Sequence, residues 1–221
     1  MPKGASWTYC HLSVMLADEF LPVFDVSDEV AVVVAADAAT TWRTLMNADL
    51  IQVGQRRPLV GVLGALRALP EIATHLLRGQ RPPEAPDRLT LRGMTQLPGS
   101  RGGWILLGER AGDEIALGLV GKFWRPVIEY ASVEPGGFMA LNMPGYAKTV
   151  YALGVRPVDD DRTLLWAVMR TATTDEQARR RFRRYWMLGV GSGAHALVNG
   201  LLDVVREDAE TVSSALLPGD P

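Results

Sequence analysis

The first clear hydrophobic pattern along the chain predicts a strand that is followed at once by a helix. The run Asp28–Ala36 is rich in β-branched and small apolar residues, which predicts a strand. Asp37 is placed to cap a short helix, Ala38–Asn47, whose single large aromatic residue, Trp42, falls on its inner face. Residues 1–27 form a leader with apolar positions at roughly helical spacing, and we expect the leader to pack onto the domain.

A second apolar stretch, Pro58–Leu77, repeats at helical spacing. Pro70 lies inside it. Because proline removes a hydrogen bond from a helix interior, we expect two helices that break at this residue. The segment that follows, RGQRPPEAPD at 78–87, is predicted to be a loop from its proline and charge content.

From residue 88 onward the pattern changes to short apolar runs. Turn-forming sequences separate them: PGSRGG, RAGD, EPGG, MPG and VDDD. This direct succession predicts antiparallel pairing, since parallel strands need long crossover connections. Together with the first strand, the runs predict a sheet of six to seven strands. The later strands are expected at Arg88–Gln96, Trp104–Glu109, Glu114–Phe123, Gly137–Asn142, Tyr146–Val155 and Thr163–Thr171.

The chain closes with one long amphipathic helix, predicted over Asp175–Glu207. Thr174 and Gln177 match a T-x-x-Q capping box at its start. One face carries an apolar stripe that runs through Phe182, Trp186 and Val190. The opposite face carries the arginines Arg180, Arg183 and Arg184.

These elements predict one α+β domain over residues 28–210, with a frayed tail at 211–221. A sheet that faces solvent on one side must cover its other face, and the long helix is the available cover. We therefore expect a helix-grip fold, in which a curved antiparallel sheet packs on the C-terminal helix, with short helices after the first strand. The sheet and the helix can then enclose a space between them.

The same order of elements resembles the START-like superfamily, also called SRPBCC. Three segments are similar to uncharacterised bacterial proteins of that superfamily: GLVGKFWRP at 118–126, MPGYAK at 143–148, and the stretch from Asp161 through RRFRRYW to the AE at 209–210. The resemblance covers roughly residues 28–210. It implies a helix-grip fold and a ligand cavity. The superfamily includes lipid-transfer domains, polyketide cyclases and plain carriers, so the resemblance implies no single activity.

One position departs from the family pattern. Such relatives often carry an acidic residue two positions before the arginine that matches Arg170, and this chain has Val168 there. If that carboxylate serves the cavity in relatives, this chain lacks it. The departure favours binding over catalysis.

Composition narrows the function only a little. The chain has 221 residues, of which 48% are hydrophobic and 22% charged, and its net charge of −2 gives no general attraction to nucleic acid. Cys10 is the only cysteine, so the chain has no intramolecular disulfide and no cysteine-built metal site. We see no clear signal peptide, and the longest charge-poor apolar run, taken as Pro58–Leu66, is too short to span a membrane. We expect a cytoplasmic protein.

The residue types that usually carry catalysis or bind metals are scattered. His11, His75 and His195 lie on three separate predicted elements, so we expect no metal and no cofactor. Ser192, in the sequence GVGSGA, lies inside the long helix and not on a strand-to-helix turn, so we assign no catalytic residue. The glycines around Ser192 either kink the helix or let a strand approach closely, or they break the helix beside a cavity; these interpretations stay open.

Three sets of charged residues have a bland and a functional interpretation. Asp113, Glu114 and Asp159–Asp161 fit turn solvation, with paired acid/base work as the alternative. Glu109 shares a face with Ile105 and Leu107 by alternation, so it either points inward as an acid or base or lies exposed at an edge. The arginine face is either solvated or in weak contact with an anionic membrane or a phosphorylated ligand, through Arg180, Arg183 and Arg184.

Aromatic residues are the better clue to function. Seven of them fall on the predicted sheet or its covering helix, which is more than core packing needs unless they line a space. The candidate cavity residues are Trp104, Leu106, Glu109, Leu117, Leu119, Phe138, Tyr151, Trp166, Val168, Arg170, Trp186, Val190 and His195.

Three functional hypotheses follow. The first is a carrier or sensor that binds an apolar small molecule such as a lipid or polyketide. The second is a cyclase- or dehydratase-type enzyme, which requires two of Glu109, Tyr151, Arg170 and His195 to converge in the cavity. The third is an interaction protein that docks through the 58–77 helices or the arginine face. Oligomeric state stays open, and we expect no nucleic-acid partner.

Overall fold

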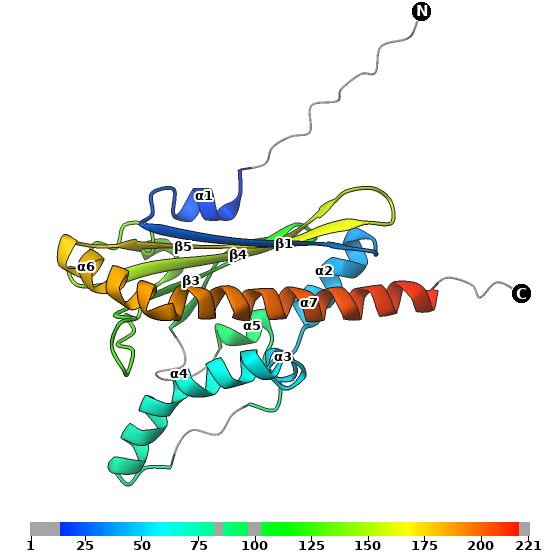
Figure 1. Ribbon diagram of the computed structural model, residues 1–221. Helices are drawn as coiled ribbons and strands as arrows, with labels where there is room; N and C mark the ends of the chain where they lie inside the picture. Colours follow the sequence, from blue (N-terminus) through cyan, green and yellow to red (C-terminus); the bar gives the residue numbers. More distant parts are fainter. Residues whose placement is uncertain (1–13, 82–85, 97–102, 217–221) are drawn as a thin grey trace, which may run out of the picture.

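A computed structural model describes residues 14–81, 86–96 and 103–216, and within these ranges the chain forms one five-stranded antiparallel sheet with helices on both faces (Figure 1). The strands run in the order β1-β5-β4-β3-β2. Their bounds are β1 Val26–Val34, β2 Trp104–Arg110, β3 Glu114–Gly121, β4 Ala147–Pro157 and β5 Thr163–Thr173. The helices are α1 Leu16–Phe20, α2 Ala38–Asn47, α3 Leu50–Arg56, α4 Pro58–Leu77, α5 Leu91–Met94, α6 Glu176–Tyr185 and α7 Gly191–Leu216.

The predicted α+β helix-grip class is confirmed, but the sheet has five strands and not six to seven. Two predicted strands are wrong. The run Arg88–Gln96 contains the one-turn helix α5, in which the Thr90 hydroxyl accepts from the Gly93 N–H at 3.1 Å. The run Gly137–Asn142 follows the 3₁₀ turn Pro135–Gly137 and stays irregular. Both runs are too short for hydrophobic spacing to distinguish strand from turn.

The helix after the first strand forms as predicted, and the strand, Val26–Val34, begins and ends two residues before the predicted run Asp28–Ala36. The Asp37 side chain accepts from the Thr40 N–H at 2.8 Å and caps α2, which spans the predicted residues, so this prediction is confirmed. Trp42 is 9% exposed and packs in the core. A local cap followed by one apolar stripe made this helix readable from the sequence.

The predicted break at Pro70 is wrong, because α4 is continuous from Pro58 to Leu77. The chain breaks earlier, between α3 and α4, and Pro58 occupies the first turn of α4. A proline there costs little, since the first N–H groups of a helix have no partner within the helix. Figure 1 shows α4 extending away from the sheet.

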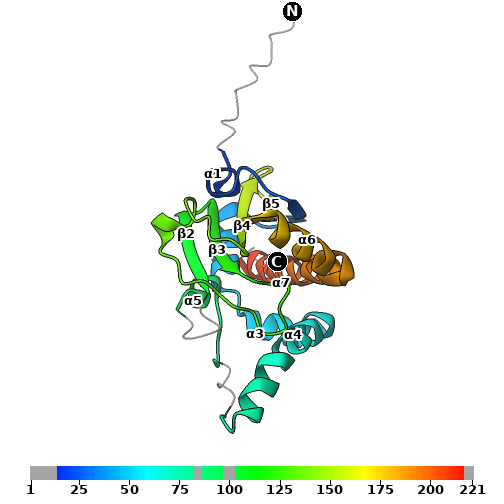
Figure 2. The same ribbon diagram turned by 90° about the vertical axis from the view of Figure 1, so that its left-hand side faces the viewer.

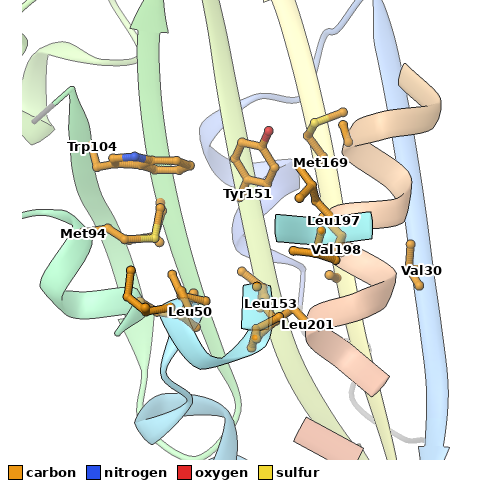
Figure 3. A pocket seen from close by; sticks show the side chains of 18 of the residues that line it. Val30, Leu50, Met94, Trp104, Tyr151, Leu153, Met169, Leu197, Val198 and Leu201 are labelled. Atoms are coloured by element: carbon orange, nitrogen blue, oxygen red, sulfur yellow. The ribbon is translucent and has the colours of Figure 1, made fainter. Parts of the chain in front are cut away.

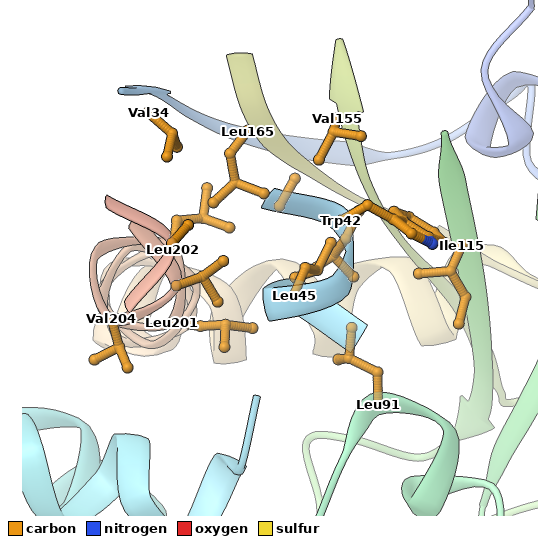
Figure 4. Packing of buried hydrophobic residues seen from close by; sticks show 14 of the residues in the cluster. Val34, Trp42, Leu45, Leu91, Ile115, Val155, Leu165, Leu201, Leu202 and Val204 are labelled. Atoms are coloured by element: carbon orange, nitrogen blue, oxygen red, sulfur yellow. The ribbon is translucent and has the colours of Figure 1, made fainter. Parts of the chain in front are cut away.

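The face of the sheet that packs on α7 holds one hydrophobic core. Leu201, Leu202 and Val204 of α7 pack with Leu165 of β5 and with Trp42 of α2 (Figure 4). Side chains alternate along each strand, so every second residue of β1, β3, β4 and β5 points to this face. We call it the inner face.

The opposite face of the sheet, which we call the outer face, is covered as well, contrary to the expectation of a solvent-facing side. Helix α1 lies on it (Figures 1 and 2), and Leu16 and Leu21 are buried against it. Phe138 is fully buried in the same cluster. Residues 1–13, with Cys10 and His11, lie outside the described residues, as do most of the PGSRGG turn and residues 82–85.

Two buried charged residues of the sheet hold α1. Both oxygens of the Glu114 carboxylate accept from the Leu16 N–H, at 2.8 and 3.0 Å. Arg170 is 6% exposed and pairs with Asp18 at 2.6 Å. Burial raises the pKa of the Glu114 carboxyl, and the Leu16 N–H and Arg110 offset only part of that effect.

The raised pKa of Glu114 predicts a pH-dependent stability. A carboxyl whose pKa is higher in the folded than in the unfolded protein stabilises the fold most below its unfolded pKa, about 4.3. That contribution is lost as the pH rises through the folded pKa. Glu114→Gln cannot ionise, so we expect its free energy of unfolding to fall less than that of the wild type between acidic and neutral pH.

Urea denaturation across this pH range measures the difference in slope. Glu19→Gln is the matched control, because the exposed Glu19 pairs with Arg110, which also contacts Glu114. Identical slopes for wild type and Glu114→Gln would contradict the prediction.

The predicted long C-terminal helix is interrupted. Helix α6 leads into a π-helical turn, Trp186–Val190, where Gly189 has φ +95° and bends the chain before α7 begins. The predicted capping box is wrong, since Asp175 caps α6 by accepting from the Ala178 N–H, and the Thr174 hydroxyl donates to the Tyr146 carbonyl instead. Helix α7 continues to Leu216, beyond the predicted end at Glu207.

The prediction that the longest charge-poor stretch is Pro58–Leu66 is wrong, because a longer one lies in this region. Tyr185–Leu202 contains no Asp, Glu, Lys or Arg. In the described part of the chain, the helical stretch Glu176–Ala215 alone has the length and apolar composition of a membrane span. Here it lies across the sheet (Figure 1).

Candidate ligand cavity

A cavity of about 610 Å³ lies between the inner face of the sheet and helices α3, α4, α5 and α7. Figure 3 shows its walls: Trp104 and Tyr151 point toward one another from β2 and β4, and Leu197 and Leu201 of α7 face them. The rings of Trp104 and Tyr151 lie 5.4 Å apart between centroids. This first lobe is lined almost wholly by apolar side chains, and its volume is typical of a small-molecule site.

A second lobe of about 670 Å³ adjoins the first, toward α6 and the bend before α7. Its walls come from β3, from the 123–130 segment after it, and from the bend itself, including Trp124, Tyr130, Trp186 and Gly189. The two lobes meet at residues that line both: Trp104, Tyr151, Met169, Ala194 and Leu197.

The alternation of the strands explains which residues reach the cavity. Tyr151 and Met169 are directly paired on β4 and β5, and both point inward. Small residues on α7, Gly193 and Ala194, leave room above them. The small residues therefore let α7 pack on the sheet and still leave an open space beneath it. This favours the interpretation that the helix breaks beside a cavity.

Besides two threonines, the polar residues that line the lobes are Asp28, Gln55, Arg125, Tyr130, Tyr151 and Tyr185. Tyr151 is the central one, and burial raises the pKa of its hydroxyl far above the ordinary value, so it stays a neutral donor and acceptor. The Thr149 and Thr171 hydroxyls bond to each other at 2.8 Å in the second lobe. Among the described residues we find no hydrogen bond from the Tyr151 hydroxyl to another side chain. It is available to a ligand.

Six of the predicted cavity residues line the space. They come from β2, β3 and β4 and from the bend, and the fold brings them together around the two lobes. They are Trp104, Leu117, Leu119, Tyr151, Trp186 and Val190.

Four predicted residues lie on the outer face. Phe138 and Trp166 are buried in the cluster under α1, and Arg170 pairs with Asp18 beneath the Phe24 ring, 4.7 Å away. Val168 borders the first lobe from β5, but its side chain packs in the outer cluster. The prediction failed here because alternation separates two faces without indicating which one has a cavity.

The remaining three also lie away from the interior. A β-bulge between Leu106 and Gly108 shifts the register of β2, so Glu109 lies opposite Ile115 and does not share a face with Ile105 and Leu107. The Glu109 carboxylate accepts a hydrogen bond from Arg92 Nε at 3.1 Å. Leu106 is 37% exposed. His195 is exposed, and its Nδ1 lies 3.0 Å from Asp28.

The space between the sheet and the long helix was predicted, but the walls that α3, α4 and α5 supply were not, and the lining residues of α7 were not named as cavity candidates. The available signal was the excess of apolar residues over 58–77, for which no buried partner was assigned. The missed residues include Leu50, Val53, Val60, Leu91, Met94, Leu197, Val198 and Leu201.

The polar residues needed for the enzyme hypothesis do not converge. Of Glu109, Tyr151, Arg170 and His195, Tyr151 alone lines the cavity. Within the described ranges, no group of three or more His, Cys, Asp or Glu side chains is placed to hold a metal ion. The arrangement can enclose an apolar molecule and offer it the Tyr151 hydroxyl where the two lobes meet.

No family model matches the chain, and no curated protein matches it. Among solved structures, it is similar to a conserved protein from Geobacillus kaustophilus, with 10% identity, 84% of this chain and 96% of that chain covered, and a TM-score of 0.37. A hypothetical protein from Helicobacter pylori matches at 12% identity over 93% and 99% of the two chains, with a TM-score of 0.35.

An aromatase/cyclase from Streptomyces sp. R1128 matches at 13% identity over 85% of this chain and 97% of its own, with a TM-score of 0.30. At such identities and TM-scores the likeness carries no information on ligand or activity. The observed elements stand independently of it. With its antiparallel sheet, the helices after β1 and the C-terminal helix across the inner face, the chain has the helix-grip fold, which is the fold of the START-like superfamily.

Proposed function

We propose that the chain binds an apolar small molecule in this two-lobed cavity, as a carrier or sensor. The observation that supports the proposal most is the continuous apolar lining of the first lobe, which meets the second lobe at five shared residues. Leaving such surface in contact with water is unfavourable, by about 25 cal/mol for each Å² of apolar surface. A ligand that fills the space removes that cost.

The position of the Tyr151 hydroxyl suggests what the ligand carries. It is a neutral group at the junction of the lobes, so it suits a hydroxyl or carbonyl on an otherwise apolar molecule. The cyclase- or dehydratase-type alternative has less support, because none of Glu109, Arg170 and His195 lines the cavity beside Tyr151.

Native mass spectrometry of protein purified from its host tests the proposal directly. We expect a bound apolar species that denaturation releases. Uptake of the neutral fluorescent probe N-phenyl-1-naphthylamine by ligand-free protein provides a second measurement. A protein that carries no ligand and does not take up the probe would overturn the proposal.

Removing one hydroxyl should weaken one class of ligand. We expect Tyr151→Phe to lower the affinity for 1-naphthol by about 3- to 10-fold, the value of one neutral hydrogen bond. The affinity for 1-methylnaphthalene, which has the same shape without the hydroxyl, should stay unchanged. Displacement of N-phenyl-1-naphthylamine measures both.

Tyr146→Phe is the matched control for this experiment. Tyr146 packs in the outer cluster, and its hydroxyl donates to Glu129 at 2.8 Å. Its loss should leave both affinities unchanged. Equal losses for 1-naphthol and 1-methylnaphthalene in Tyr151→Phe would instead indicate a change in cavity shape.

A further inference from the structure

The bend between α6 and α7 exposes two large apolar side chains to solvent. Met187 is 73% exposed and Leu188 is 84% exposed. They are turned outward because Leu188 has φ −75° and ψ 19° and Gly189 has φ +95°, so the helix does not continue regularly through this point. Phe182 and Trp186 stack on the inner side of the same turn, with ring centroids 5.7 Å apart.

Arginines border these apolar side chains. Arg181, Arg183 and Arg184 are exposed, and none of them forms an ion pair within the described residues. Residues three and four apart on a helix are neighbours, so Arg184 lies next to Met187 and Leu188. Figure 1 shows α6 at the opposite end of the molecule from the C-terminal end of α7.

The segment across the second lobe has the same character. Trp124, Arg125 and Pro126 line that lobe together with Leu188 and Gly189. The next residue, Val127, is 38% exposed, and the Arg125 side chain is 52% exposed, although it pairs with Glu129 at 2.6 Å. The mouth of the second lobe is therefore edged on both sides by exposed apolar side chains and arginines.

We propose that this edge, made of Arg125, Val127, Arg183, Arg184, Met187 and Leu188, is a docking surface for an anionic lipid bilayer. Arginine suits phosphate because its planar fork binds two oxygens at once, and the apolar side chains suit the headgroup boundary. A stable protein interface needs about 1,200 Å² or more, which a few side chains do not supply. Interfacial insertion needs no such area.

The docking surface borders the mouth of the second lobe. An apolar ligand can therefore pass between a bound bilayer and the cavity without crossing water. That consequence rests on the proposed ligand binding. The docking itself rests only on the exposed residues at the end of α6, in the bend and in the 123–130 segment.

Vesicle flotation tests the proposal with the full chain. We expect binding to vesicles of phosphatidylcholine with phosphatidylglycerol, weaker binding to phosphatidylcholine alone, and a loss of binding as salt screens the arginines. Arg183→Ala with Arg184→Ala should weaken binding by about 10- to 30-fold. Met187→Glu should weaken it by about tenfold or more.

Val158→Glu is the matched control, because Val158 is a 51% exposed apolar residue in the β4–β5 hairpin, away from the bend. It should bind vesicles as the wild type does. Uptake of N-phenyl-1-naphthylamine, measured without vesicles, should be unchanged in Met187→Glu. Flotation therefore reports docking and probe uptake reports ligand binding, so a failure of either one is seen separately.

Three results would overturn the proposal. The first is wild-type protein that does not float with anionic vesicles, and the second is a Met187→Glu variant that floats as well as the wild type. The third is self-association of the wild type that Met187→Glu abolishes in sedimentation velocity, which would assign the surface to a second copy of the chain.

Discussion

Ala194→Trp is expected to reduce the affinity for N-phenyl-1-naphthylamine by about 100-fold or more. Ala194 lines both lobes, at the point where α7 passes over Tyr151 and Met169. An indole placed there projects into the space that a ligand must occupy. Because the space is already open, the added side chain fills a void and does not force a packed core apart.

The unfolding temperature separates blocking from misfolding. We expect Ala194→Trp to unfold within a few degrees of the wild type, or slightly above it, because filled cavities are more stable than empty ones. Asn199→Trp is the matched control on the exposed side of α7 and should bind the probe normally. Normal uptake by a folded Ala194→Trp protein would place the probe outside this cavity.

Leu202→Ala is expected to lower the free energy of unfolding by about 3 kcal/mol. Leu202 is 1% exposed and packs with Leu165 and Leu45 in the inner core (Figure 4), and it does not line either lobe. Removing three carbons there leaves a new cavity among atoms that cannot collapse around it. The lost apolar contacts and the unfilled volume both count against the folded state.

Leu197→Ala is the comparison that makes this prediction specific. Leu197 lies on the same helix but faces both lobes, so part of its surface meets open space and not packed atoms. Its replacement in ligand-free protein should cost at least about 1 kcal/mol less than that of Leu202. Urea denaturation measures both, and equal costs would mean that the lobes are closed in solution.

Local signals predicted the elements that depend on neighbours in sequence. Asp37 and the helix after it are correct because a cap and one apolar stripe act within a few residues. The four later strands with clear alternation are also in place. The predictions at Arg88–Gln96, Gly137–Asn142 and Pro70 were wrong, because a short apolar run or a single proline has little local preference and contacts elsewhere decide it.

The candidate site was predicted only in part, for a reason that Trp166 and Tyr151 illustrate. Both are aromatic residues on strands of the same sheet, and alternation correctly separates inward from outward positions along each strand. No local sequence signal indicates that α1 covers the outer face, which carries Trp166. None indicates that α7 stands away from the inner face at Tyr151. The bulge at Leu106–Gly108 adds a further shift that alternation alone cannot anticipate.

The sequence by itself determined the class of the domain, the order of its main elements and the apolar character of what they enclose. Only the tertiary structure decided where the enclosed space lies, that α3, α4 and α5 supply part of its wall, and that the C-terminal helix bends at Gly189 beside its mouth. The physical reason is that propensity and capping act over a few residues. A cavity is the volume left between elements far apart in the chain, and its position depends on how all of them pack.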